Sequence, residues 1–169
     1  MRFNYFFIFA LLLSASCYSN AAERPAKVAF EQLKTLVGNW RATDPSNNTS
    51  VEVKLIANGT ALVETWTMSP TRQSMTVYTL DGQRLLATHY CPQGNAPRLA
   101  FNKTDSTGAH HFEFIDGTNL HLEGSHEHAF WIRKDPSGTL TRNETYISNS
   151  AKYDPKKNIG DTEIFTREK

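Results

Sequence analysis

The histidines are the first residues in this chain whose type and spacing could support chemistry. His126 and His128 are two positions apart, so on a β-strand both side chains would project from one face. Two imidazoles in this arrangement suit a zinc ion, and His89 is the natural third ligand from another strand. A three-histidine metal site with an open position would activate water. The alternative is that these are rim or loop histidines that hydrogen-bond to their neighbours.

The same residues could also support haem or thiol chemistry. No histidine follows His128, so the final strands offer no axial ligand to a haem, and only His89 or His128 could ligate one. We expect no bound cofactor. Cys91 shares a strand face with His89, but no helix N-terminus or basic cluster lies beside it to activate its thiol. We expect Cys91 to be a small buried apolar residue.

Three charged residues lie within segments whose pattern otherwise predicts strands: Glu64, Arg98 and Glu144. If they point inward they need partners, and an Arg–Glu pair inside the fold could orient a polar head group. If they point outward they are solvated surface charges. Glu64 shares a face with Leu62, Trp66 and Met68, which is the bulkier side of its strand. Both sides carry apolar residues, so the pattern leaves the direction of Glu64 open.

Composition narrows the function classes. The chain has 169 residues, which corresponds to one domain, and 18 basic against 17 acidic residues give a net charge of +1. This balance offers no electrostatic reason to expect nucleic acid or an anionic membrane as a partner. The sequence also contains no serine-centred elbow, phosphate-binding loop, Cys-x-x-Cys pair or His-Glu-x-x-His helix.

The elements that must position these residues are one helix and many short strands. Apolar residues at helical spacing predict a helix over Ala26–Leu36, after Pro25. After this helix, apolar residues recur at every second position, which is typical of strands. Strands are expected at 38–43, 50–57, 60–68, 73–80, 84–91, 98–103, 110–115, 128–134, 139–147 and 160–167.

Turn signals separate these strands. Asn58-Gly59 and Asp81-Gly82 predict tight hairpins of type I′, which need positive φ at both central residues. Asp116-Gly117 is a further turn signal, and the stretch from Lys152 to Ile159 reads as a mobile loop. Many short strands joined by tight turns indicate a sandwich or an up-and-down barrel.

The N-terminal stretch has the layout of a secretory signal peptide. Arg2 precedes a short apolar block, and Ser19 and Ala21 offer small residues before a cleavage site. We therefore assign 1–21 to the signal peptide and 22–169 to the folded domain. A weaker lipobox-like pattern ends at Cys17, whose acylation would anchor the chain to a membrane. Either route leaves Cys91 without a disulfide partner.

Two sequence blocks carry a family resemblance. Gly38-Asn39-Trp40, directly after the predicted helix, resembles the Gly-x-Trp that opens a lipocalin-type barrel. The blocks 76–91 and 94–98, with 112–114, 117–120 and 126–128, are similar to a lipocalin-like bacterial family of the calycin superfamily. The resemblance implies an all-β antiparallel up-and-down barrel of about ten strands, with the helix plugging one end against Trp40. It also implies a periplasmic or secreted location. The C-terminal third departs from the pattern, because Glu144 stands where such proteins tend to carry Trp.

These observations support three hypotheses. The first is an exported binding protein that holds an apolar or amphipathic small molecule, since barrels of this size can enclose one ligand. Its site would contain His89, Arg98, His128, Tyr90, Trp66 and Glu64, with Tyr78, Phe101 and Phe112 as further apolar wall. The alternative is an enzyme whose metal or acid–base site combines His89, His126, His128 and Glu64. A third is a structural protein with a packed core and no ligand.

Overall fold

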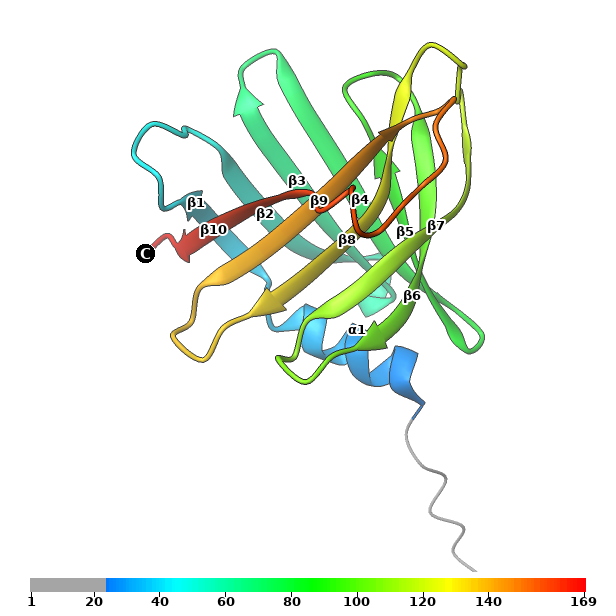
Figure 1. Cartoon of the computed structure of the whole chain (residues 1–169). Helices are drawn as coiled ribbons and strands as arrows, with labels where there is room; N and C mark the ends of the chain where they lie inside the picture. The colour runs from blue at the N-terminus through cyan, green and yellow to red at the C-terminus, as the bar shows by residue number, and fades with distance from the viewer. Residues whose placement is uncertain (1–23) are drawn as a thin grey trace, which may run out of the picture.

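The computed structural model describes residues 24–169 (Figure 1). It contains one α-helix, one short 3-10 turn and ten strands. Their bounds are α1 Pro25–Lys34, β1 Gly38–Ala42, β2 Ser50–Ile56, η1 Ala57–Gly59, β3 Ala61–Ser69, β4 Arg72–Asp81, β5 Arg84–Tyr90, β6 Ala96–Thr104, β7 His110–Thr118, β8 Ser125–Lys134, β9 Leu140–Ser148 and β10 Asp161–Arg167. The expected signal peptide, its cleavage site and Cys17 lie outside the described residues.

The ten strands form one closed barrel. Each strand pairs antiparallel with its neighbours in sequence, and β1 pairs with β10 to close the sheet. This confirms the predicted fold class, an all-β antiparallel up-and-down barrel with one short N-terminal helix. Each predicted strand corresponds to an observed one. Within residues 24–169, no helix is both long enough and apolar enough to cross a bilayer.

The hairpins at the two strongest turn signals both form, but only the first has positive φ at both central residues, as a type I′ turn requires. Asn58 and Gly59 have φ of 54° and 86°, and the Thr60 N–H donates a 3.2 Å hydrogen bond to the carbonyl oxygen of Ala57 across them. Ala57, with φ of 49°, is a further left-handed residue in this loop. In the second hairpin Asp81 pairs with Arg84, and Gly82 has positive φ whereas Gln83 does not. A type I′ turn needs positive φ at both positions, and the β-carbon of Gln83 makes that unfavourable. The type I′ prediction was therefore wrong at Asp81-Gly82, whereas Asn58 and Gly59 both have the positive φ that it requires.

Asp116-Gly117 was predicted to be a turn but lies inside β7. The glycine is needed there for a different reason. A β-carbon at Gly117 would lie 2.8 Å from Pro97 Cα on β6, so the two backbones approach too closely for a side chain. A glycine in a strand can therefore mark close strand packing as well as a reversal of the chain.

The helix α1 covers one end of the barrel, as the family resemblance implied (Figure 1). It buries Ala26, Ala29, Phe30 and Leu33 and contacts β4, β5 and β6. Trp40 on β1 is fully buried, and its Nε1 donates a 2.8 Å hydrogen bond to the carbonyl oxygen of Leu36. The guanidinium of Arg167 lies 4.4 Å from the Trp40 ring centre. Helix, first strand and last strand are thereby joined.

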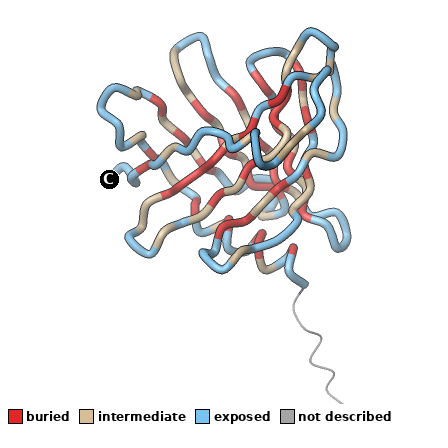
Figure 2. The backbone as a smooth tube through the Cα atoms, in the orientation of Figure 1, coloured by how far each residue is buried: buried red, intermediate tan, exposed pale blue. Residues whose placement is uncertain are grey.

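Buried residues follow the inner face of the strands in alternation with exposed ones (Figure 2). The half of the barrel near α1 is a packed apolar core that includes Leu62, Leu85, Leu99, Phe112 and Ile132. Beyond this core, towards the end opposite α1, the inward side chains become polar and charged. The change from apolar to polar filling creates the candidate site.

Candidate functional site

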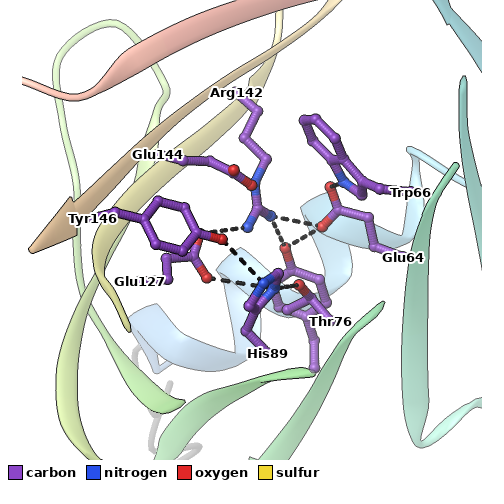
Figure 3. A network of polar contacts seen from close by, with 9 residues as sticks. Glu64, Trp66, Thr76, His89, Glu127, Arg142, Glu144 and Tyr146 are labelled. Atoms are coloured by element: carbon purple, nitrogen blue, oxygen red, sulfur yellow. Dashed lines mark hydrogen bonds and ion pairs between the residues drawn. The ribbon is translucent and has the colours of Figure 1, made fainter. Parts of the chain in front are cut away.

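Nine inward-facing side chains form a buried polar network across the barrel (Figure 3). They come from strands on opposite walls: Glu64 and Trp66 from β3, Thr76 and Tyr78 from β4, His89 from β5, Glu127 from β8, and Arg142, Glu144 and Tyr146 from β9. The period of two places Arg142, Glu144 and Tyr146 on one face of β9. Barrel closure then brings them opposite β3 and β4.

Arg142 is the centre of this network. Its side chain has no exposed surface, and its guanidinium donates to three carboxylates. Nη1 lies 2.8 Å from Glu64 Oε2, Nη2 lies 2.9 Å from Glu127 Oε1, and Nε lies 2.9 Å from Glu144 Oε1. The guanidinium also lies 4.0 Å from the ring centre of Phe130. One buried cation therefore holds three acids together.

Glu64 is the best-satisfied of the three acids. Besides Arg142, Oε1 accepts a 2.7 Å hydrogen bond from Trp66 Nε1, and Oε2 accepts one of 2.5 Å from the Tyr78 hydroxyl. Three donors therefore satisfy the two oxygens of this buried carboxyl group. The sequence pattern leaves the direction of Glu64 undecided, and in the structure its side chain points inward and is 1% exposed.

Glu127 and Glu144 are less well compensated. Burial raises the pKa of Glu127 to about 7, although Arg142 acts to lower it. Burial likewise raises the pKa of Glu144 to about 7 against the lowering effect of Arg142. Glu127 Oε2 is buried and has no hydrogen-bond partner among the residues that the structure describes. Two carboxyl groups in this network can therefore exchange protons near neutral pH.

His89 links the network to Tyr146. Its Nδ1 lies 3.0 Å from Thr76 Oγ1 and 3.5 Å from Glu127 Oε2, and its Nε2 lies 3.1 Å from the Tyr146 hydroxyl. Burial, with a smaller contribution from Arg142, lowers the pKa of His89 to about 4. A neutral imidazole has one donor and one acceptor nitrogen. His89 can therefore pass a proton between Tyr146 and the Thr76–Glu127 side only by changing tautomer.

An open cavity of about 880 Å³ lies above the network, at the end of the barrel opposite α1. Loops from 46–49, 71–72 and 91–93 form its rim, and Trp66, Glu144 and Tyr146 reach it from the network. The lining is mainly polar: Ser46, Asn47, Asn48, Thr49, Thr71, Arg72, Ser74, Gln93, Glu144, Tyr146 and Glu163, with Trp66, Met68, Cys91 and Pro92 as its less polar members. Cys91 is buried, as predicted.

The predicted ligand-binding residues separate into two groups. Glu64, Trp66 and His89 face the interior, and of these Trp66 lines the cavity. Tyr90 is 48% exposed and alternates with buried His89 and Cys91, so it lies outside the barrel. Arg98 is also exposed, and its guanidinium pairs with Asp116 on the outer surface. The prediction that Tyr90 and Arg98 face the interior was wrong. Successive residues of a strand point to opposite faces, and the buried His89 and Leu99 beside them take the inward positions.

The expected apolar wall was also only partly found. Tyr78 and Phe112 lie in the packed core, and Phe101 packs against that core. Of the predicted wall residues, only Trp66 lines the cavity.

His126 and His128 lie on the other face of β8 from Glu127, in an aromatic cluster outside the barrel. His126 Nε2 is 3.0 Å from His128 Nδ1, and the two rings pack against Phe114 and Tyr153. The structure does not bring His89 to this pair. Within residues 24–169, no three His, Cys, Asp or Glu side chains are grouped so that they could hold a metal ion. The expected three-histidine arrangement does not form.

Sequence reasoning missed Arg142, Glu127 and Tyr146. A signal for the β9 residues was present, because Leu140, Arg142, Glu144 and Tyr146 recur at every second position of a predicted strand. Glu127 was obscured by the two histidines that flank it. The expected inward Arg–Glu pair exists, but Arg142 rather than Arg98 supplies the guanidinium.

The closed ten-stranded barrel fits a calycin or lipocalin-like fold. Comparison of the chain with protein-family models, curated proteins and solved structures gives no match.

Proposed function

We propose that this protein binds a small molecule in the cavity at the open end of its barrel. The observation that carries the proposal is the cavity itself, about 880 Å³ in volume, with the buried charged network at its floor. Ligand sites in proteins are typically preformed hollows of this size with a few convergent polar groups. Trp66, Glu144 and Tyr146 would be the contacts that the network presents to the ligand.

The lining favours an amphipathic or polar ligand over a purely apolar one. Most lining side chains carry hydroxyl, amide or charged groups, which would lose hydrogen bonds to water against an apolar molecule. Trp66 and Met68 offer limited apolar surface. The ligand would therefore combine an apolar body with polar groups that replace the lost water.

The two other hypotheses fit the geometry less well. A structural protein with a completely packed core would have no such cavity. A metal enzyme would need His89, His126 and His128 to converge, whereas His126 and His128 lie outside the barrel. An acid–base site retains support from one observation: Tyr146 both lines the cavity and contacts His89 Nε2 at 3.1 Å. Such chemistry would require ligand binding at the same place.

We also propose that the protein is exported to the periplasm or secreted. The proposal rests on the sequence of residues 1–21 alone. Mass spectrometry of the mature protein from a bacterial host tests it. A chain that begins at Ala22 would support cleavage, and an acylated chain beginning at Cys17 would support anchoring. A full-length chain in the cytoplasm would overturn both.

A fluorescent probe and a blocking substitution test the binding function. Dansyl N-pentylamide is neutral and amphipathic, and its emission rises when it leaves water. Ser74 lines the cavity opposite Trp66 on the neighbouring strand, so Ser74→Trp should obstruct the part of the hollow beside Trp66 and abolish the enhancement. The matched control is Ser106→Trp, at an exposed turn near the α1 end. Enhancement that is absent in the wild type, or unaffected by Ser74→Trp in a folded variant, would overturn the proposal.

A further inference from the structure

We propose that the ligand of this cavity is an organic cation, such as a protonated amine on an amphipathic body, and that Glu144 receives its charge. This inference rests on the proposed function and narrows the ligand class. It follows from the balance of charge in the network, from the parts of the network that a ligand can reach, and from the aromatic neighbours of Glu144.

The network holds more acid than its one cation can neutralise. Arg142 contacts Glu64, Glu127 and Glu144, and each of these bonds is 2.8 or 2.9 Å long. The network thus has three carboxyl groups for one guanidinium. Glu127 Oε2 is buried with no hydrogen-bond donor among the described residues. A further positive charge entering from the cavity would stabilise this arrangement, because attraction between charges is strong where water is excluded.

An anionic ligand has no comparable partner in the network. The Arg142 side chain is 0% exposed, and its Nε, Nη1 and Nη2 atoms already donate to carboxylates. A carboxylate or phosphate from the cavity could reach it only by displacing an acid already bound there. Arg72 is the one cationic side chain among the residues that line the cavity, against Glu144 and Glu163. The surroundings therefore disfavour an anion.

Glu144 is the acid of the network that a ligand can touch. Its side chain is 24% exposed and lines the cavity, whereas those of Glu64 and Glu127 are 1% and 0% exposed. Within residues 24–169, the Glu144 carboxyl group accepts hydrogen bonds from Arg142 alone, at Oε1. Figure 3 shows Glu144 between Arg142 and Tyr146 on β9, with Trp66 on the opposite side of the network. Trp66 and Tyr146 both line the cavity, and aromatic rings attract cations.

The same geometry couples cation binding to proton release. A cation at Glu144 favours the ionised carboxylate, so a proton held by this group would leave to solvent as the cation binds. Charged and titratable groups surround Glu144 from every packed strand: Arg142 and Tyr146 on β9, Glu127 on β8, His89 on β5, Glu64 on β3, Arg72 on β4, and Glu163 and Asp161 on β10. Because burial raises the pKa of Glu144 to about 7, affinity for a cation should rise between pH 6 and pH 8.

Three dansyl probes of matched size test the proposal on the folded protein. Their five- or six-atom tails end in an ammonium (dansylcadaverine), a methyl (dansyl N-pentylamide) or a carboxylate (dansyl-6-aminohexanoate). At pH 8 we expect the ammonium probe to bind about tenfold or more tightly than the methyl probe, as suits a charge-assisted hydrogen bond. The carboxylate probe should bind most weakly. For the wild type, affinity for the ammonium probe should rise by up to about tenfold from pH 6 to pH 8.

Glu144→Gln should remove the preference for the ammonium probe and its pH dependence. Glu52→Gln, at an exposed acid paired with Lys54 on the outside of β2, is the matched control and should leave both unchanged. If all three probes bind equally, or if the carboxylate probe binds best, the cation inference is wrong while cavity binding stands. A preference that survives in folded Glu144→Gln also overturns it. If none of the probes binds, or if Ser74→Trp abolishes the binding of none of them, both the cation inference and the proposed function are wrong.

Discussion

Glu64 and Arg142 are 78 positions apart in sequence, yet Arg142 Nη1 lies 2.8 Å from Glu64 Oε2 in the middle of the barrel. They belong to β3 and β9, which are not neighbours in the sheet. Their ion pair therefore spans the interior and connects opposite walls. Such a pair is costly to desolvate and is stable only with its hydrogen bonds complete.

Arg142→Met should be strongly destabilising, because it leaves three inward carboxyl groups without their shared cation. We expect a loss of about 3–5 kcal/mol in the free energy of unfolding, measured by urea denaturation at pH 8. The loss should be smaller at pH 5, where the orphaned acids bind protons. Arg41→Met is the control, since Arg41 and Glu168 form an exposed pair worth about 0–1 kcal/mol. Equal losses in the two variants would contradict the central role of Arg142.

Tyr78→Phe should show the cost of one missing hydroxyl in the network. The Tyr78 hydroxyl donates to Glu64 and accepts from Arg142 Nη1 at 2.8 Å. The phenylalanine ring would keep the edge contacts with Phe112 and Phe130. We expect a loss of about 1–3 kcal/mol in thermal or urea unfolding. Tyr90→Phe, at an exposed position, should change stability by less than about 0.5 kcal/mol. A Tyr78→Phe value as small as this would mean that the hydroxyl adds nothing to stability.

Glu144→Gln should change how stability depends on pH. The folded-state pKa values of Glu144 and Glu127 are about 7, above the ordinary 4.5, so the folded protein binds more protons between these values. Their burial therefore lowers stability as pH rises from 4.5 to 7. His89 acts in the opposite direction, because its folded-state pKa of about 4 lies below the ordinary 6.5.

Glu144→Gln removes one of these groups. Relative to wild type, the free energy of unfolding of the variant should therefore increase by on the order of 2 kcal/mol as the pH rises from 5 to 8. Urea midpoints across this range measure it. The exposed Glu52→Gln variant should show no comparable trend. A parallel pH profile for Glu144→Gln and wild type would show that Glu144 does not change its protonation in this range.

Gly38→Ala should destabilise the join between α1, β1 and β10. Gly38 has φ of +140°, where a side chain is strained, and a β-carbon there would clash with the Arg167 guanidinium. The Arg167 guanidinium is held at this position, because its Nη1 donates a 2.7 Å hydrogen bond to the carbonyl oxygen of Val37. We expect a loss of about 1–3 kcal/mol in unfolding free energy.

A double-mutant cycle separates the two causes in Gly38→Ala. In an Arg167→Ala background the clash is absent, so the substitution should cost less and only the backbone strain should remain. Equal costs in both backgrounds would assign the whole effect to the φ angle. A neutral Gly38→Ala would contradict both explanations.

Much of the architecture could be predicted because it depends on local patterns. Alternation and turn residues located every strand, and helical spacing with Pro25 located α1. Turn details were less predictable, since Gln83 does not adopt the left-handed conformation that a type I′ turn requires. Gly117 resembled a turn signal because a glycine that permits close strand packing looks the same in sequence as one that permits a reversal.

The amino-acid sequence by itself determined that this chain forms short antiparallel strands behind one helix, with Gly38 and Trp40 where the two meet. Only the tertiary structure decided which face of each strand points inward. Both faces of β3 carry apolar residues, and the choice depends on how all ten strands close. Closure brings β3 and β9 across from each other, so Glu64 meets Arg142 rather than Arg98. Local periodicity contains no information about which residues meet across the interior, because the curvature of the whole sheet sets their distance.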